Sequence, residues 1–591
     1  MPVARCRPIT LWVIAALVGG LAAVLAPSAG AVTARKLAPL HQVRKVNLRQ
    51  LSAAPVGSSR LRLSPGALEM LQREQEGDRR GDPRAARPYV PGGRVVVDPV
   101  TDGFEGLSHS QQAFASGVEL EPPDQGLCGG TASSTTYLFE SVNDALALYD
   151  TDTNQRSPAV GLNSFYGLAP SFDPTTGKYG PFLSDPKCYF DPDTRRWFHS
   201  VLEIATDPAT GAFASKAATL LAVSATSDPL GDYHIYSIDA TDPGGPHCPC
   251  FGDQPLIGAD ANGFYVSTAE YNIDSSAGSF FNGAQIYALD KRALETGAPA
   301  PAVHIATGTT RTGTVQPATT PTGRYETAQG GTEYFLSGFD CLPPDCAVNP
   351  GPGDRITVWA LTNTASLRSA SPSVKLLTNT IRSLPYAGPV GQQQKPGFRP
   401  LGRSLSEPVP TVSANDDRMN QVVYADGRLW SGLNTSVRPG PRDGILWFSV
   451  LPTVRSRAVD ATIADQGYVA ASDAFLSFPS VGVNDRGRGV IAFSLMGQSY
   501  HPSAAWTPVG RGGADGAVRV AQLGSRPEDG FSCYPEFYPA GTPGPFQCRW
   551  GDYSASFALP NGDVWSATEY IGAGARTTSA NWSTFVWPVR R

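Results

Sequence analysis

Short apolar runs separated by turn residues dominate the chain, and residues 252–273 show the pattern most completely. Asp253 precedes the apolar run 256–259, and the later run 264–268 is rich in aromatic and β-branched residues. Between them, residues 260–263 (Asp-Ala-Asn-Gly) are of the types that tolerate the positive φ angles of tight turns. The pattern therefore predicts a β-hairpin of two antiparallel strands.

The same order of an aspartate, an apolar strand, a turn and a second strand recurs along the chain. Copies begin near residues 124, 185, 253, 317, 417, 477 and 552. Repeated groups of four short strands are typical of β-propellers, so we predict an all-β fold, a seven-bladed β-propeller. The repeats are longer than the usual propeller repeat, and we expect long loops between some strands.

The last repeat is short of strands, because only the β-rich run 584–587 follows its hairpin. An open sheet edge would leave a row of unpaired backbone groups. We therefore expect the strand near 94–98 to pair with the strand near 584–587 and to close a propeller that spans residues 92–591. A ring of six repeats beside a separate sandwich is the alternative.

The N-terminal residues 1–31 have the features of a secretory signal peptide: a basic start, an apolar stretch and small residues at 28–31. A membrane anchor is the alternative, but the apolar stretch is short for a span and contains two glycines. Residues 32–91 are polar without strand periodicity, so we expect a linker or pro-segment that is partly disordered, with one helix near 65–76. The mature chain is expected to be secreted and to enter no membrane.

Composition narrows the class of protein. The 591 residues include 62 Gly and 52 Pro, which suits a fold with many turns and argues against long helices. A formal net charge of −5 provides no basic surface of the kind that nucleic-acid binding requires, so no nucleic acid is expected as a partner. We expect a monomer.

Of the nine cysteines, only Cys6 lies in the signal segment, and the even number that remains predicts disulfides in an exported protein. Cys341 and Cys346 are expected to close a small loop, and Cys533 and Cys548 a segment before the last repeat. The pairing of the other four stays open: Cys128, Cys188, Cys248 and Cys250. The last two, with His247, could instead form half of a metal site.

Acidic residues occupy equivalent places in the repeats. Those before the first strands are Asp124, Asp185, Asp253, Asp417 and Asp552, and those near the ends of the second strands include Glu203, Glu270 and Glu569. Because both places lie on one face of a propeller, we expect these carboxylates to converge at one end of the central channel. Several like charges cannot crowd together without compensation.

Three hypotheses account for the acids. In the first, each aspartate accepts hydrogen bonds from backbone N–H groups of turns and strand ends. In the second, they hold Ca²⁺, with Asp253 and Asp552 as candidate ligands. In the third, two acids with separated pKa values act on a sugar. The candidate catalytic residues are Asp185, Asp253, Glu270 and Asp552. The candidate ligand-binding residues are Asp124, Glu203, Asp417, Arg549, Tyr553 and Glu569.

Three segments carry a resemblance: 121–130 (EPPDQGLCGG), 248–272 (CPCFGDQPLIGADANGFYVSTAEYN) and 550–570 (WGDYSASFALPNGDVWSATEY). They resemble a group of uncharacterised secreted bacterial proteins that are described as hypothetical or propeller-like. The resemblance extends from about residue 104 to the C-terminus and implies an exported propeller, without an established reaction. Sialidase-type propellers are similar by fold analogy alone, and a fold does not determine a function.

We therefore predict a secreted binding or scaffold protein whose acidic channel mouth holds a cation or a glycan, with an extracellular glycan or cell-surface component as partner. The alternative is a glycoside hydrolase or sialidase-like enzyme that uses paired Asp and Glu. Carboxyl pairs about 5 Å or about 6.5–9.5 Å apart across an open pocket would favour hydrolysis. Acids bonded to N–H groups, or clustered at ion-coordination distance, would favour binding.

Overall fold

The computed structural model describes residues 33–52, 61–78, 87–98, 100–276, 278–308, 312, 314–339, 353–542, 544–574 and 576–590. The expected signal segment and the expected Cys341–Cys346 pair lie outside the described residues. Within them the fold is all-β, and no helix is long and apolar enough to cross a membrane.

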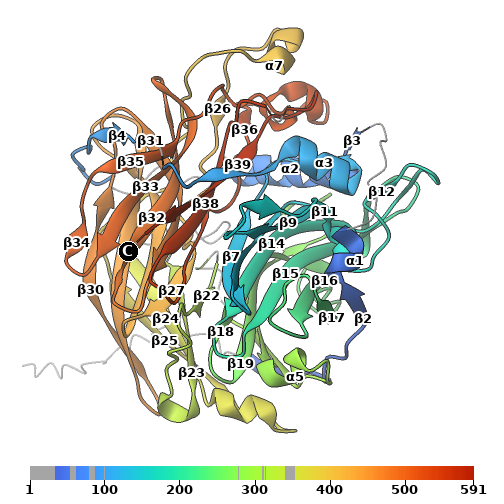
Figure 1. Cartoon of the computed structure of the whole chain (residues 1–591), viewed down its shortest axis with the longest axis vertical. Helices are drawn as coiled ribbons and strands as arrows, with labels where there is room; N and C mark the ends of the chain where they lie inside the picture. The colour runs from blue at the N-terminus through green and yellow to red at the C-terminus, as the bar shows by residue number, and fades with distance from the viewer. Residues whose placement is uncertain are drawn as a thin grey trace, which may run out of the picture. The chain divides into compact units, whose positions relative to one another are not determined.

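Most sheets consist of strands that follow one another in the chain and pair in antiparallel order (Figure 1). The first contains β7 (Gly126–Ala132), β8 (Thr135–Val142), β9 (Ala145–Asp150), β10 (Gln155–Arg156) and β11 (Val160–Gly161). The second contains β14 (Phe182–Asp191), β15 (Arg196–Thr206), β16 (Phe213–Ser224) and β17 (Asp232–Asp239). The third contains β18 (Cys250–Ala259), β19 (Gly263–Asn272), β20 (Phe281–Asp290) and β21 (Ala302–Ala306).

The C-terminal half continues in the same way. An eight-stranded sheet joins β22 (Gln316–Thr319), β23 (Thr332–Gly338), β24 (Arg355–Thr362) and β25 (Lys375–Arg382) to β27 (Val422–Ala425), β28 (Arg428–Val437), β29 (Arg442–Val454) and β30 (Val459–Val469). The next contains β31 (Phe475–Val483), β32 (Arg488–Gly497), β33 (Tyr500–Gly510), β34 (Gly513–Ala514) and β35 (Val518–Gln522). The last contains β37 (Ala555–Ala558), β38 (Val564–Tyr570) and β39 (Ser583–Val589).

Smaller elements connect and cover these sheets. The short two-stranded pairs are β3 (Arg62–Leu63) with β6 (Val118–Glu119), β12 (Phe172–Asp173) with β13 (Lys178–Tyr179), and β26 (Thr411–Val412) with β36 (Gln547–Cys548). The helices are α1 (Leu48–Ser52), α2 (Pro65–Asp78), α3 (His109–Ser116), α4 (Leu162–Phe165), α5 (Lys291–Glu295), α7 (Pro400–Leu405), η1 (Ala328–Gly330), η2 (Thr364–Arg368), η3 (Phe531–Cys533) and η4 (Pro535–Phe537). The helix expected near 65–76 corresponds to α2.

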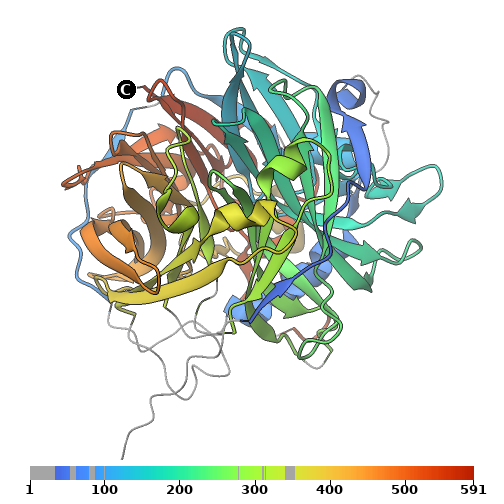
Figure 2. The ribbon, with the colours of Figure 1, turned by 90° about the horizontal axis from the view of Figure 1, so that it is seen from below.

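The first strands of successive sheets form a closed ring of contacts. β7 contacts β14, β14 contacts β18, β18 contacts β22, β22 pairs with β27, β27 contacts β31, β31 contacts β37, and β37 contacts β7. Figure 1 shows the two ends of this order meeting, because β38, drawn in red, lies beside β7, drawn in light blue. Figure 2 shows the described strands from below, with the colours passing from teal through green and yellow to red.

The segment expected to be a linker instead supplies edge strands. β1 (Thr33–Lys36) pairs with β21, and β2 (Arg44–Asn47) pairs with β17. Neither strand alternates apolar and polar residues. An outer strand that extends an existing sheet is held by backbone hydrogen bonds, so it does not need an apolar face. The part of residues 32–91 that the structure describes is therefore more ordered than its composition indicated.

The prediction that the strand near 94–98 pairs with the strand near 584–587 is wrong. β4 (Val95–Val97) runs parallel to β35, and the strand that pairs with β39 is β5 (Phe104–Ser108). Glu140 of β8, fully buried, helps to fix this arrangement. Its carboxylate accepts hydrogen bonds from the Leu107 N–H of β5 at 3.0 Å, from the Thr584 hydroxyl of β39 and from the Tyr149 hydroxyl of β9. One side chain thus joins the last sheet to the first.

Replacing Glu140 by Ala should destabilise the fold by about 3 kcal/mol, because buried donors would lose a charged acceptor. Urea denaturation of the purified variant measures the change in the free energy of unfolding. The exposed Glu536→Ala serves as the matched control and should leave that free energy unchanged. A loss below about 1 kcal/mol for Glu140→Ala would contradict the closing role of this residue.

Candidate functional site

Three aspartates meet where the first strands begin: Asp124 before β7, Asp185 in β14 and Asp552 before β37. One carboxylate oxygen from each lies within 4.8 Å of the others, and all three side chains are buried. We call Asp124, Asp185 and Asp552 the carboxylate hub. The hub brings together two sheets that are neighbours in the chain and a third from the opposite end of the sequence.

Protein donors surround the hub. The donors are the Asp552 N–H and Asn143 Nδ2 to Asp124 (2.6 and 2.5 Å), the Tyr553 hydroxyl to Asp185, and Gln254 Nε2, Asn415 Nδ2 and Arg549 Nη2 to Asp552 (2.7, 2.5 and 3.2 Å). The Asp552 N–H bond to Asp124 links residues 428 positions apart. The hub therefore also contributes to holding the N-terminal and C-terminal sheets together.

The backbone near the hub adopts the left-handed conformation at several equivalent places. The φ angles are 44° at Asp124, 58° at Asp185, 49° at Gln254 and 57° at Asn415. Strands β14 and β18 each have a register shift there, between Ser184 and Lys187 and between Asp253 and Leu256. Bulges of this kind redirect side chains and are frequent beside functional sites.

Burial and repulsion from neighbouring carboxyls raise the pKa values of Asp185 in the hub and of Asp253 beside it. Burial, with the charge of Asp552, raises the pKa of Asp185 to about 6. Asp253 is half-buried, and burial together with Asp185 and Asp552 raises its pKa well above the ordinary value. Asp185 and Asp253 therefore hold protons more firmly than exposed carboxyls do.

Lys187 and Arg418 were missed by the sequence analysis. Burial lowers the pKa of Lys187 to about 7, although nearby carboxylates act in the opposite direction, and its Nζ lies 2.7 Å from the centroid of the Tyr553 ring. Arg418 forms a two-pronged ion pair with Asp416 at 2.7 and 2.8 Å. Arg418 lies two residues after its partner Asp416, whereas the fold is needed to bring Lys187 against the distant Tyr553.

A second group of acids adjoins the hub: Glu569 of β38, Glu121 before β7 and Glu528. Burial, followed by the charges of Glu121 and Asp124, raises the pKa of Glu569 well above its usual range. Burial and then the neighbouring carboxyl likewise raise the pKa of Glu528, and burial raises that of Glu121. These acids extend the group of buried carboxyls at this end of the first strands, and their raised pKa values favour the protonated form.

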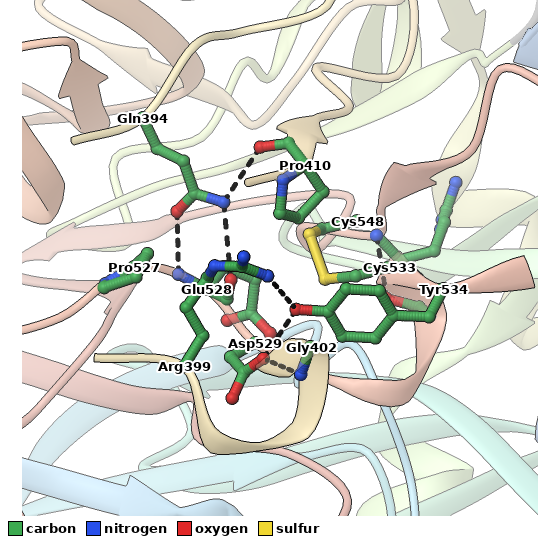
Figure 3. Close-up of a disulfide and its surroundings, with 12 residues drawn as sticks. Gln394, Arg399, Gly402, Pro410, Pro527, Glu528, Asp529, Cys533, Tyr534 and Cys548 are labelled. Atoms are coloured by element: carbon green, nitrogen blue, oxygen red, sulfur yellow. Dashed lines mark hydrogen bonds between the residues drawn. A yellow bond between two sulfur atoms is a disulfide. The ribbon is translucent and has the colours of Figure 1, made fainter. Parts of the chain in front are cut away.

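Hydrogen bonds hold segment 527–550 against the loop that contains α7 (Figure 3). The Cys533–Cys548 disulfide closes this segment, which is the pairing expected from the sequence. Figure 3 shows Gln394 between the two chain segments, with its amide donating to Pro410 O at 3.1 Å and its oxygen accepting from the Glu528 N–H at 2.7 Å. Asp529 accepts from the Gly402 N–H at 2.8 Å. These bonds hold the segment that leads into Asp552.

The other cysteines settle the open pairing. Cys128 is joined to Cys188, which connects the first strands β7 and β14 of neighbouring sheets, and Cys248 is joined to Cys250. The alternative of half a metal site at His247–Cys250 does not fit, because thiols in a disulfide are not available as thiolate ligands.

Not every predicted site residue reaches the hub. Arg549 and Tyr553 contact it directly, and Glu569 lies next to it: a Cβ on Gly551 would be 3.3 Å from Glu569 and 3.5 Å from Asp124. Glu203 is surrounded by different charges, Arg44 and Lys216. At the start of β27, the ion pair with Arg418 is made by Asp416, one residue before the predicted Asp417.

Glu270 is also separated from the hub. In the β18–β19 hairpin, Glu270 lies opposite Gly252, whereas Asp253 lies opposite Ala269. Because consecutive strand residues point to opposite faces, Glu270 and Asp253 lie on opposite faces of the sheet. Glu270 is instead near Cys248 and Cys250. The expected convergence of all acids is therefore wrong for this residue.

Comparisons with known proteins add little to this geometry. No family model matches the chain, and no curated protein matches it. The resemblance to secreted bacterial proteins thus stays a prediction.

Solved structures give weak similarities. A fungal alcohol oxidase in complex with copper is 9% identical, with 83% of this chain and 77% of that chain covered and a TM-score of 0.36. Drosophila Plexin A in complex with Semaphorin 1b is 11% identical, covering 84% and 88%, with a TM-score of 0.33. An α-L-arabinofuranosidase from Fusarium graminearum is 9% identical, covering 83% and 98%, with a TM-score of 0.32. Similarities this low support no inference about the site.

The raised pKa values predict a pH dependence of stability. In the folded chain Asp185 keeps its proton from its ordinary pKa of 3.8 up to about 6, and burial raises the pKa of Glu270 from 4.5 to about 7. Their stabilisation is complete below the ordinary values and is lost as the pH rises through 6 to 7. With calcium removed by a chelator, the Tm should therefore fall between pH 5 and pH 7.5.

Asp185→Asn, which cannot titrate, should reduce this fall in Tm, and the exposed Asp98→Asn should not change it. Differential scanning calorimetry at matched ionic strength measures both. An unchanged pH profile in Asp185→Asn would show that the buried carboxyl does not carry the proton assigned to it.

Proposed function

We propose that the chain is an exported seven-bladed β-propeller that acts as a binding protein and holds a divalent cation, calcium by its ligand chemistry, at the carboxylate hub. The antiparallel pairing of strands that follow one another in the chain, and the closed sequence of contacts between first strands, support the propeller. The disulfides and the N-terminal sequence support export to an oxidising compartment.

The observation that carries the cation is the spacing of the hub oxygens. Two oxygens that bind the same Ca²⁺ at about 2.3–2.6 Å lie no more than about 5 Å apart. Oxygens of Asp124, Asp185 and Asp552 all lie within 4.8 Å of one another. Each carboxylate has about four lone-pair positions, so hydrogen bonds from neighbouring donors leave room for a bound ion.

A second observation points to the same ligand. Gln254 is 1% exposed, and its Nε2 is bonded to Asp552, yet its carbonyl oxygen has no hydrogen-bond donor within the described residues. An oxygen buried beside the hub without a partner costs free energy unless something binds it. Ca²⁺ accepts amide carbonyl oxygens as well as carboxylates.

The charge balance favours a cation too. Asp124, Asp185, Asp253, Asp416 and Asp552 gather near three cationic side chains, Lys187, Arg418 and Arg549. The carboxyl groups outnumber the cationic side chains, so that loss of the protons held by Asp185 and Asp253 leaves an excess of buried negative charge, which is costly. A divalent ion would offset the excess.

Glycoside hydrolysis is the second candidate. Asp253 favours it, because a half-buried carboxyl with a strongly raised pKa is suited to be a general acid. The separation of Glu270 from the hub removes one member of the predicted catalytic set. The hydrogen bonds to Asp124 and Asp552 use those carboxylates in the way expected of a binding or structural site.

Calcium should raise the Tm of the chelator-treated protein in a saturable manner, because a ligand at 100 times its Kd adds about 2.7 kcal/mol of stability. Asp552→Asn and Asp185→Asn should each abolish the rise, and Asp98→Asn should retain it. Terbium luminescence, competed by calcium, gives a direct measure of binding. Wild-type protein with neither a calcium-dependent Tm nor bound terbium would contradict the cation site.

A panel of aryl glycosides separates the two candidate functions. The binding function predicts no turnover by the calcium-loaded wild type. If the wild type hydrolyses any glycoside of the panel and Asp253→Asn does not, with its fold intact by circular dichroism, the protein is an enzyme and the binding function is wrong.

A further inference from the structure

A cavity of about 90 Å³ lies among the first strands and is lined in part by Tyr553, whose hydroxyl donates to Asp185 of the hub. Its polar lining includes Gln125, Lys187 and Ser554, and its apolar lining includes Phe190 and Phe557. The Cys128–Cys188 disulfide also lines it. The cavity is therefore formed jointly by β7, β14 and β37 together with β18, β22 and β27.

Two polar groups of the lining, on Gln125 and Ser554, lack protein partners, and a third, the Lys187 amine, lies over the face of the Tyr553 ring. Gln125 donates through Nε2 to Tyr553 O at 2.7 Å, but its Oε1 is buried without a donor, as is the Ser554 hydroxyl. Gln125 and Ser554 are 1% and 4% exposed.

The apolar part of the lining is held in place by two glycines of β7. A Cβ on Gly129 would lie 2.4 Å from the Phe557 ring, and one on Gly130 would lie 2.4 Å from the Phe190 ring. Any larger residue would push these rings away from the strand. Both phenylalanines are half-buried, so each keeps part of its surface accessible. Such surfaces are suited to pack against the C–H groups of a sugar ring.

Charge restricts the ligand. The Lys187 amine in the lining disfavours a cation, and the Asp185 carboxyl bonded to the Tyr553 hydroxyl disfavours an anion. A neutral hydroxyl group matches the unpartnered atoms, because its oxygen accepts from Lys187 or Ser554 and its hydrogen donates to Gln125. The volume is below that of a typical ligand pocket, about 300–1,000 Å³, so only a small group can enter.

We propose that this cavity binds a neutral polyhydroxylated ligand no larger than one sugar residue, either free or at the end of a glycan, with Lys187, Gln125 and Ser554 as its polar contacts. The site lies beside the carboxylate hub and needs no cation there. It therefore goes beyond the cation-binding function and can succeed or fail independently of it.

Isothermal titration calorimetry tests the site with glucose, galactose, mannose, arabinose and glycerol, and with acetate and ethanolamine as charged probes. A glycan array tests binding of a sugar residue at the end of a glycan. We expect at least one neutral probe to bind and both charged probes to bind more weakly. Lys187→Met should reduce the affinity about tenfold, because a hydrogen-bond donor to the ligand is lost.

Ser554→Ala removes only an unbonded hydroxyl and should also weaken binding, with an unchanged Tm that excludes misfolding. The exposed Lys178→Met is the matched control and should bind as the wild type does. Asp552→Asn should lose calcium but keep the saccharide. The proposal is overturned if no neutral probe or array glycan binds, if a charged probe binds best, or if Lys187→Met and Ser554→Ala bind as tightly as the control.

Discussion

Buried carboxylates need hydrogen-bond donors. This requirement constrains the start of the first strands more than any other. A buried carboxylate without hydrogen bonds or a counter-ion is strongly destabilising. Asp124 meets the need with the Asp552 N–H and with Asn143, and Asn143 in turn accepts from the Asp185 N–H at 2.8 Å. Since each donor belongs to another loop or sheet, satisfying the hub also fixes the order in which the sheets meet.

The residues with a left-handed backbone conformation result from the same requirement. Asp124, Asp185 and Asn415 are of types that adopt positive φ at little cost, but Gln254 and Phe478 are not. The Phe478 N–H donates to Asn434 at 2.7 Å, much as the Asp185 N–H donates to Asn143. The bulge is therefore a feature of the repeat itself, whether or not its side chain is acidic. The aspartates use a backbone geometry that the fold supplies.

Local chemistry made the hairpins predictable. The turn at 260–263 and the flanking apolar runs lie where β18 and β19 meet, and the disulfide at Cys533–Cys548 follows from short spacing. The convergence of Asp124, Asp185 and Asp552 was also predictable, because all three precede or begin equivalent strands. The hairpins and this disulfide depend on residues close together in the sequence, and the convergence depends on equivalent places in the repeats.

Long-range contacts were not predictable in the same way. The closing strand β5 has a weaker β pattern than the Val95–Val97 run, and its place depends on Glu140 and Thr584 far along the chain. Lys187 lies in a sequence that reads as an ordinary strand, and its place over Tyr553 follows from sheets brought together by the fold. Glu270 was misplaced because the bulge after Asp253 changes which residues share a face.

The central claim is that the hub is an ion site, and anomalous diffraction from crystals soaked in terbium tests it most directly. The account predicts one strong peak at about 2.3–2.6 Å from oxygens of Asp124, Asp185 and Asp552. A well-ordered hub whose carboxylates keep their hydrogen bonds to Asn143, Gln254 and Asn415, with no peak among them, would contradict it.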